Sequence, residues 1–148
     1  MQMFSHFRFF TNLISPNYIG AVLFTFIVAF SSYAQPPVLW DATIGASSTD
    51  ESHAIWETAD GGLIIGGSSF SGISGDKTQA SNGNSDYWVV KTDSNGTVLW
   101  DKSYGGSGSD RLRAIQQTAD GGYIIGGFSF SNISGDKSEN SRGSGDFW

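Results

Sequence analysis

The chain has 148 residues, a formal net charge of −6 and no cysteine, so disulfides, thiolate metal sites and cysteine nucleophiles are excluded. An acidic chain repels phosphate backbones, and we therefore expect no nucleic-acid partner. Glycine is unevenly placed: 1 of 20 lies in residues 1–34, whereas 7 of 11 phenylalanines lie there. Because an interior glycine costs a helix about 1 kcal/mol relative to alanine, the glycine-rich remainder disfavours a helical fold.

Residues 1–34 have the order of charge, apolar core and small residues that is typical of a secretory signal peptide. Arg8 lies in the start, an uncharged apolar run of 12 residues follows over 19–30, and small residues precede position 35. A membrane span needs about 20 apolar residues, so this run is too short for an anchor. We predict cleavage between Ala34 and Gln35, a secreted or cell-surface mature chain, and no membrane insertion after cleavage.

The remainder of the chain, residues 35–148, repeats itself at a spacing of 60. Residues 40–88 and 100–148 align without a gap, and 28 of the 49 positions are identical. Self-similarity at a fixed period is typical of repeat architectures. We expect two tandem repeats, about 38–97 and 98–148, of which the second is incomplete, so that the chain is part of a longer protein. The alternative is that chains of two repeats assemble into a ring.

Each repeat is expected to contribute four strands and no helix. In the first repeat the predicted strands are 54–58, 63–69, 86–92 and 97–104, with Asp-Gly and Asn-Gly turns and a loop rich in Gly, Ser and Asn. Side chains alternate across a strand, so Tyr87 and Val89 lie on one face and Trp88 on the other, and both faces need cover. Residues 38–41 match the fourth strand of a preceding unit.

Four-stranded sheets that are apolar on both faces and recur at a fixed period are typical of β-propeller blades. We therefore predict an all-β fold of four-stranded antiparallel blades of β-propeller type, with about two blades in this chain. Trp88, Trp100 and Trp148 are expected to lie between blades. A β-sandwich and a β-solenoid are the alternatives, but solenoid coils run to about 20–30 residues, and a sandwich does not predict such close self-similarity.

One long motif string resembles a known group of repeats. Written as one period that combines the two repeats, it runs from WDKSYGGSGSD (100–110) through TADGGYIIGG (118–127) and SGDK (134–137) to DYWVVKTDSNGTVLW (86–100). This string resembles the tandem propeller-type repeats of secreted Bacteroidota proteins, which often end in a sorting domain for type IX secretion. The resemblance covers residues 38–148 and implies an exported, multi-blade, non-catalytic surface protein, without naming a ligand.

Acidic residues that recur at the spacing of 60 are expected to act in turns and loop caps. Asp60 and Asp120 share one turn position, and Asp76 and Asp136 share one loop position. His53 is the one histidine after residue 34, which excludes a zinc site of three histidines. A serine triad would also need an activated serine, and no nucleophile motif is recognisable in the sequence. We predict no catalytic residue and no cofactor-binding residue.

Two places are candidates for ligand binding. The loop 74–86 carries oxygen ligands that suit calcium, namely Asp76, Asn82, Asn84 and Asp86. The loop lacks the ordered spacing of an EF-hand, and a solvated loop is the alternative. Trp56 is a candidate for stacking on a ligand, because its equivalent Gln116 shows that the scaffold does not demand an aromatic side chain there.

The function we expect is an exported, non-catalytic repeat protein that serves as a cell-surface binding or structural module. Glycans or other surface polymers are the expected partners. The alternative is part of a propeller-type enzyme, a hydrolase or lyase that acts on polysaccharide.

Overall fold

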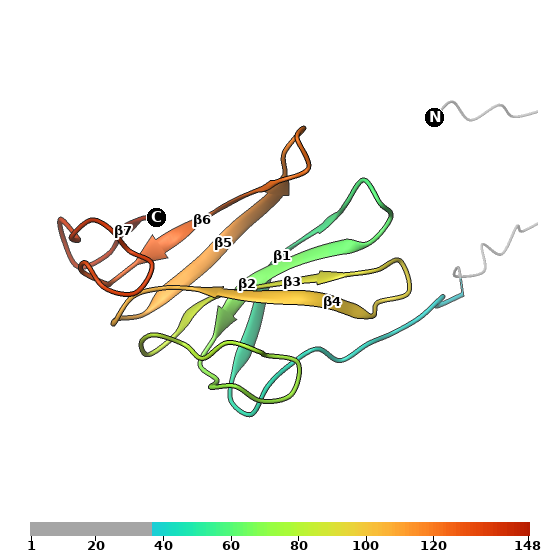
Figure 1. Cartoon of the computed structure of the whole chain (residues 1–148), viewed down its shortest axis with the longest axis horizontal. Coiled ribbons are helices and arrows are strands. Elements are labelled where there is room, and N and C mark those ends of the chain that lie inside the picture. Colours follow the sequence, from blue (N-terminus) through green and yellow to red (C-terminus); the bar gives the residue numbers. More distant parts are fainter. Residues whose placement is uncertain (1–36) are drawn as a thin grey trace, which may run out of the picture. The chain divides into compact units, whose positions relative to one another are not determined.

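The computed structural model describes residues 37–148, and these form two antiparallel β-sheets (Figure 1). The strands of the first sheet are β1 (Asp50–Glu57), β2 (Leu63–Ser69), β3 (Asp86–Thr92) and β4 (Val98–Tyr104). Those of the second are β5 (Asp110–Gln117), β6 (Tyr123–Ser129) and β7 (Asp146–Phe147). Each sheet keeps its strands in chain order. The structure has no helix in residues 37–148, which confirms the all-β prediction.

The predicted signal peptide, residues 1–34, lies outside the described residues. Within the part that the structure does describe, no helix has the length and apolar character needed to cross a membrane.

Glycine closes the hairpin turns. Gly61 in the β1–β2 turn has a φ of 79°, and Gly96 in the β3–β4 turn has a φ of 83°. Residues with a Cβ atom rarely adopt this left-handed region, whereas glycine adopts it without steric cost. The predicted Asp-Gly and Asn-Gly turns are confirmed, and Gly121 in the β5–β6 turn, at 87°, has the same conformation as Gly61.

The second sheet uses the strand register of the first, shifted by 60 residues. Asp50 pairs with Ser69 at one end of β1–β2, and Asp110 pairs with Ser129 at the same end of β5–β6. Strand β7 continues this pattern, since Phe147 pairs with Phe128 as Tyr87 pairs with Ser68. The residues of β1 and β2 therefore have structural counterparts in β5 and β6.

Two predicted strands, 54–58 and 38–41, differ from the structure by more than one residue. Strand β1 begins at Asp50 and not at residue 54, because its polar first residues pair with the end of β2. Residues 38–41, predicted as a strand, carry no strand assignment. A strand exists through its backbone partners, and no neighbouring strand lies beside this segment among the described residues.

The core lies between the two sheets. Ile64, Tyr87 and Val89 of the first sheet pack against Leu112 and Ile115 of the second, and all five are at most 7% exposed. Partly buried side chains complete this core: Ala54, Tyr123, Ile125 and Trp148. Full burial of an apolar side chain of this size contributes about 1.5–3 kcal/mol, so this contact between sheets is a main source of stability.

The other face of β3 is also buried, as the alternating apolar residues predict. Trp88 is 6% exposed and donates its indole N–H to Oδ2 of Asp101 at 2.9 Å. The ammonium of Lys77 lies 5.8 Å from the centre of the Trp88 ring. In the second repeat Lys137 lies at the same distance from Trp148, so this ammonium–indole contact belongs to the repeated scaffold.

The three tryptophans expected between blades differ in burial. The ring of Trp148 lies 5.0 Å from that of Tyr87, so it joins the two sheets. Trp100 is 38% exposed, but its ring also reaches the second sheet, at 5.8 Å from Tyr123 in an edge-on arrangement. Trp88 faces away from the second sheet, because side chains alternate along β3.

Candidate functional site

The edge strands β1 and β5 each contain a β-bulge at the same position. The pairing of β1 with β2 shifts between Ser52 and Ala54, which leaves His53 as the extra residue. The pairing of β5 with β6 shifts between Leu112 and Ala114, which leaves Arg113 as the extra residue. A bulge leaves its extra residue without a ladder partner and redirects the side chain, and bulges are frequent beside functional sites.

The two bulge residues contact each other, and Glu51 joins them. Nη1 of Arg113 lies 3.3 Å from Nδ1 and 3.5 Å from Nε2 of His53. Because these distances are nearly equal, the guanidinium lies against the imidazole ring and not end-on to one nitrogen. Oε2 of Glu51 lies 3.4 Å from Nε2 of His53. We call these three residues, Glu51, His53 and Arg113, the bulge cluster.

The bulge cluster offers a carboxylate, an imidazole and a guanidinium at an open edge of the molecule. The side chains of His53 and Glu51 are 20% and 44% exposed, so both are accessible to a ligand. Arg113 also lies over the ring of Phe128, at 5.1 Å from the ring centre. This arrangement holds the guanidinium in place with donors left for a ligand, since an arginine has five N–H donors. Such a set can bind hydroxyl and carboxylate groups.

The bulge cluster lies on the strands that differ more between the two repeats than β2 and β6 do. Strands β1 and β5 share three of their eight residues, whereas β2 and β6 share five of seven. Glu51 is replaced by Arg111 in the second repeat, and His53 by Arg113. Since scaffold residues recur, a concentration of differences on the edge strands favours recognition there over structural support.

The predicted stacking residue Trp56 lies on the same edge strand as the bulge cluster. It is 50% exposed and pairs with Ile64 across β1–β2. Trp56 lies three positions after His53, about 10 Å along an extended strand. An exposed indole and the polar bulge cluster therefore lie within the reach of one polymeric ligand.

The four residues that were candidates for calcium have different hydrogen-bond partners. Oδ2 of Asp86 accepts a hydrogen bond from the backbone N–H of Asn82 at 2.6 Å, so these two are in contact. Asp76 accepts from the backbone of Gly45, and the side-chain amide of Asn84 donates to Ser109.

The buried state of Asp86 is also unfavourable for calcium. Its side chain has no exposed surface, and burial raises its pKa, which favours the neutral acid over the carboxylate that calcium binds. Residues 37–148 contain no group of three or more His, Asp or Glu side chains arranged to hold a metal ion. Calcium in this loop stays a prediction.

Recurring aspartates and serines hold the segments that precede β1 and β5. Oδ2 of Asp76 accepts from the N–H of Gly45, and Oδ2 of Asp136 accepts from that of Gly105, both at 3.0 Å. Three further pairs of equivalent side chains accept hydrogen bonds from backbone N–H groups in the same way. The N–H groups of Ala46 and Gly106 donate to Asp50 and Asp110, those of Ser48 and Gly108 to Ser71 and Ser131, and those of Ser47 and Ser107 to Ser74 and Ser134. The predicted structural role of the recurring acids is confirmed at Asp76 and Asp136.

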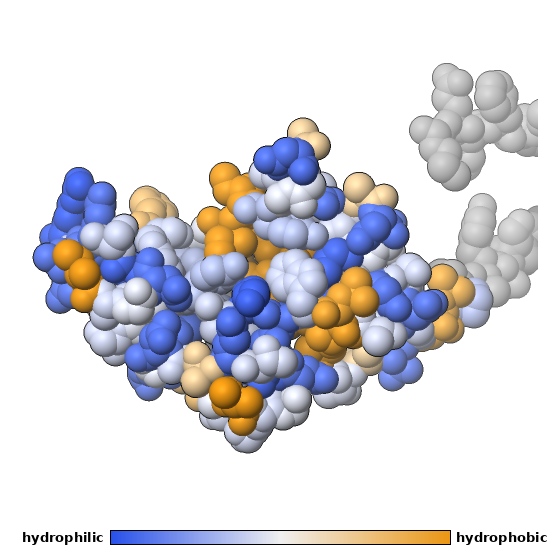
Figure 2. All heavy atoms as spheres, in the orientation of Figure 1, coloured by the Kyte–Doolittle hydropathy of each residue, from blue (hydrophilic) through white to orange (hydrophobic). Residues whose placement is uncertain are grey.

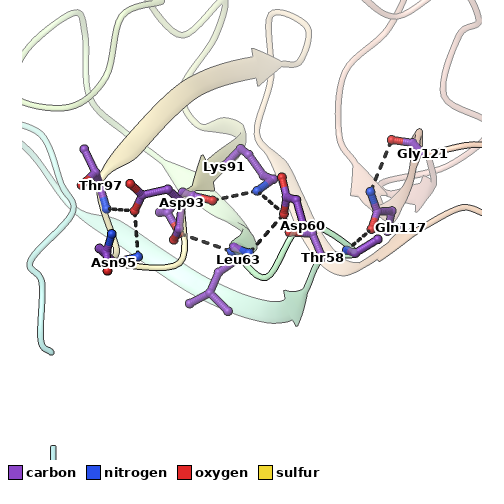
Figure 3. A network of polar contacts seen from close by, with 12 residues as sticks. Thr58, Asp60, Leu63, Lys91, Asp93, Asn95, Thr97, Gln117 and Gly121 are labelled. Atoms are coloured by element: carbon purple, nitrogen blue, oxygen red, sulfur yellow. Dashed lines mark hydrogen bonds and ion pairs between the residues drawn. The ribbon is translucent and has the colours of Figure 1, made fainter. Parts of the chain in front are cut away.

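A polar network joins the turns at the other end of the strands (Figure 3). Oδ1 of Asp60 accepts from the hydroxyl of Thr58, from the N–H of Gly62 at 3.1 Å and from Nζ of Lys91 at 3.0 Å. The ammonium of Lys91 also donates to the backbone carbonyl of Thr92 at 2.7 Å. Lys91 is 3% exposed, so Asp60 compensates a buried charge. These contacts lower the pKa of Asp60 to about 2, with the Thr58 hydrogen bond as the largest cause.

We expect Asp60→Asn to destabilise the protein more than Asp120→Asn at neutral pH. Asp120 keeps matching contacts to Thr118 and Gly122, but no lysine contacts it among residues 37–148. The measurement is a urea melt of each variant at pH 7 and near pH 2.

The pH dependence follows from the lowered pKa of Asp60. A carboxyl with a lowered pKa stabilises the fold above its unfolded pKa of 3.8, and this contribution is lost as the pH falls toward 2. The difference between the Asp60→Asn and Asp120→Asn variants should therefore narrow near pH 2. Equal losses in both variants at pH 7 would contradict the role assigned to Lys91.

Sequence reasoning gave His53 no catalytic or metal-binding role and missed its contact with Arg113. The contact joins residues 60 positions apart and depends on how the two sheets stack. A signal was nevertheless present, because His53 and Arg113 occupy equivalent positions of the repeat. Neighbouring repeats that stack in register bring equivalent positions side by side.

The fold and the bulge cluster define an all-β protein with two stacked antiparallel sheets and a charged site at the junction of their edge strands. No protein-family model and no curated protein matches this chain.

Proposed function

We propose that this chain is an exported, non-catalytic repeat protein that acts at the cell surface as a binding or structural module. The observation that carries the proposal is that residues which recur in both repeats hold the backbone, whereas other residues vary between the repeats. Recurring aspartates and serines hold backbone segments in both repeats, whereas β1 and β5 differ from each other more than β2 and β6 do. A scaffold that is constant and an edge that varies is the arrangement expected of a recognition module.

We further propose that the two sheets are blades of β-propeller type. The first sheet is a four-stranded antiparallel meander, and the second packs on its face with the same register. Strand β5 of the second sheet lies against β1, β2 and β3. In a propeller the first strands of successive blades lie nearest the central channel, and on this proposal His53 and Arg113 line that channel.

The proposed ligands are glycans or other surface polymers. An exposed indole provides a flat apolar surface for a sugar ring, and the bulge cluster provides donors and acceptors for hydroxyl and carboxylate groups. Export through the predicted signal peptide, and the type IX route that the resemblance implies for Bacteroidota, belong to the same proposal. Such a protein would meet these polymers outside the cell.

Binding to polysaccharide tests this proposal. We expect the full chain to bind at least one of cellulose, chitin, alginate and peptidoglycan in a pull-down, and Trp56→Gln to weaken that binding about 2- to 10-fold. Urea melts should show Trp56→Gln to be as stable as the wild type, since Gln occupies the equivalent position 116. The matched variant Trp100→Gln should lose stability instead, because Trp100 contacts Tyr123 across the two sheets. Equal losses of stability in the two variants would contradict the distinction between an exposed Trp56 and a Trp100 that supports the fold.

The alternative, a hydrolase or lyase acting on polysaccharide, is favoured by the contact between Glu51 and His53, because a carboxylate that orients an imidazole is a common part of catalytic sites. The same four polymers distinguish the two functions. Release of soluble sugars by the wild type, abolished in His53→Ala, would establish an enzyme and overturn the non-catalytic proposal. Binding without release supports the recognition module.

A further inference from the structure

The arginines of residues 37–148 are unevenly placed. Arg111 and Arg113 lie on β5, two positions apart, and Arg142 lies in the loop before β7. The equivalent strand β1 carries neither arginine nor lysine. Three of the four lysines in the same part of the chain are buried: Lys77, Lys91 and Lys137. Of the four basic side chains there that are not buried, two therefore lie on β5.

Neither arginine of β5 forms an ion pair within the described residues. The ion pairs there join His53 to Glu51 and Lys91 to Asp60. The carboxylate of Glu51 contacts the imidazole of His53, and the guanidinium of Arg113 contacts the same imidazole without a carboxylate of its own. Although the chain has a net charge of −6, this guanidinium is a positive charge that is free to bind an anionic group of a ligand.

The first repeat shows that these positions of the edge strand stay accessible between stacked sheets. Glu51 and His53 are the equivalents of Arg111 and Arg113, and the second sheet packs on the sheet that contains them. Their side chains nevertheless remain 44% and 20% exposed. A further repeat that packed on the second sheet in the same way would leave the two arginines accessible to a similar extent. Their accessibility is thus a property of their position in the repeat.

The guanidinium of Arg113 is held by contacts with two rings. Its Nη1 lies 3.3 Å from Nδ1 of His53, and its central carbon lies 5.1 Å from the centre of the Phe128 ring. These contacts restrict the side chain before a ligand binds, so less conformational entropy is lost on binding. The planar guanidinium matches a carboxylate, to which it can donate two parallel hydrogen bonds. The site therefore suits a carboxylate better than a neutral hydroxyl group.

The surroundings of Arg113 indicate which kind of molecule carries the carboxylate. Glu51 can accept hydrogen bonds from hydroxyl groups, and Trp56 offers an exposed indole on the same strand. Figure 2 shows that hydrophobic residues form small, separate patches among hydrophilic ones on the visible face of residues 37–148. Such a surface suits a hydrated ligand. A sugar that carries both hydroxyl groups and a carboxylate is a uronic acid.

We propose that the bulge cluster recognises uronic acid residues, so that the ligand of this protein is an acidic polysaccharide. Arg113 binds the sugar carboxylate, and Arg111, about 7 Å away along β5, attracts a further carboxylate of the polymer. The inference rests on the proposed function, since it names the class of glycan that the recognition module binds. Of the four polymers in the binding test, alginate is the polyuronate, whereas cellulose and chitin carry no carboxylate.

Affinity electrophoresis of the full chain in gels that contain alginate tests the proposal. We expect alginate to bind about 10- to 100-fold more tightly than alginate esterified with propylene glycol, because esterification removes the charge-assisted hydrogen bonds and keeps the sugar backbone. Binding should weaken as the salt concentration rises, since accessible charges are screened. Pull-downs with cellulose and chitin provide the comparison with neutral polymers.

Two substitutions with opposite expected effects give the sharpest result. Arg113→Gln should weaken alginate binding about 10-fold or more, and Arg113→Lys should weaken it too, because an ammonium group lacks the planar pair of donors. Glu51→Gln should strengthen alginate binding about 2- to 5-fold, because it removes a negative charge beside the bound carboxylate. The control Arg142→Gln loses the same charge outside the bulge cluster and should bind like the wild type. Urea melts check that each variant is folded.

Three outcomes would overturn the proposal and leave the proposed function intact. The first is equal binding of alginate and of its ester or cellulose, which would show recognition through hydroxyl groups. The second is equal binding of alginate and dextran sulfate, which would show that any polyanion is bound. The third is unchanged alginate binding in a folded Arg113→Gln variant, which would place the carboxylate elsewhere. A chain that binds none of these polymers would overturn the proposed function as well.

Discussion

Ile64→Ala should lower the free energy of unfolding by about 2–5 kcal/mol, the usual cost of truncating a fully buried isoleucine to alanine. Ile64 has no exposed surface and lies in the core between the two sheets. Truncation leaves a cavity at the contact that joins the repeats, and the surrounding β-strands cannot close it without breaking their register. The measurement is a urea melt at a concentration where the chain is monomeric.

The matched control for this substitution is Ile124→Ala. Ile124 occupies the same position of the second repeat but is 63% exposed, so we expect a change within about 0.5 kcal/mol. The two variants differ only in whether a neighbouring sheet covers the side chain. Equal losses in both would show that the stacking of the sheets in the structure is wrong.

Gly67→Ala should destabilise the fold by about 1–3 kcal/mol or more, the usual cost of overpacking. A Cβ atom on Gly67 would overlap the backbone carbonyl oxygen of Glu51 on the neighbouring strand. A flexible side chain could move aside, but this backbone is held by the pairing of β1 with β2. The added methyl group would therefore force the two strands apart next to the bulge. Thermal or urea unfolding of the purified variant measures the loss.

Gly126→Ala is the control for the glycine prediction. A Cβ atom there meets nothing within 4 Å, and alanine also restricts the unfolded chain, so we expect no loss and up to about 1 kcal/mol of gain. A further check is Gly127→Ala, at the equivalent position of the second repeat. A Cβ atom on Gly127 would overlap the carbonyl oxygen of Arg111, as a Cβ atom on Gly67 would overlap that of Glu51, so we expect a loss of stability there too. A stable Gly67→Ala variant would contradict the close strand contact at the bulge.

Features set by neighbouring residues could be predicted from the sequence. The turns at Gly61 and Gly96 depend on one residue that tolerates a positive φ, and both are present. The burial of β3 on both faces followed from its alternating apolar residues, and all seven of its residues are buried. The all-β class followed from the same local signals.

Features set by long-range contacts could not be predicted in this way. The start of β1 at Asp50 is polar, so its strand character comes from pairing with β2 and not from its own residues. The bulges at His53 and Arg113 interrupt the alternation on which strand prediction depends. Their mutual contact requires the stacked sheets. Residues 38–41 show the converse, since a strand-like sequence stays without a strand when no partner lies beside it.

The chain order of the strands has an evolutionary consequence. Every strand pair in both sheets joins strands that are adjacent in the sequence, and no strand of one sheet pairs within the other sheet. Duplication or deletion of one 60-residue unit therefore adds or removes a complete sheet and leaves every other strand pair with its original partner. Genes for such chains can change length in whole units by unequal recombination without disturbing the remaining structure. Each added unit brings one more bulge residue that is free to diverge.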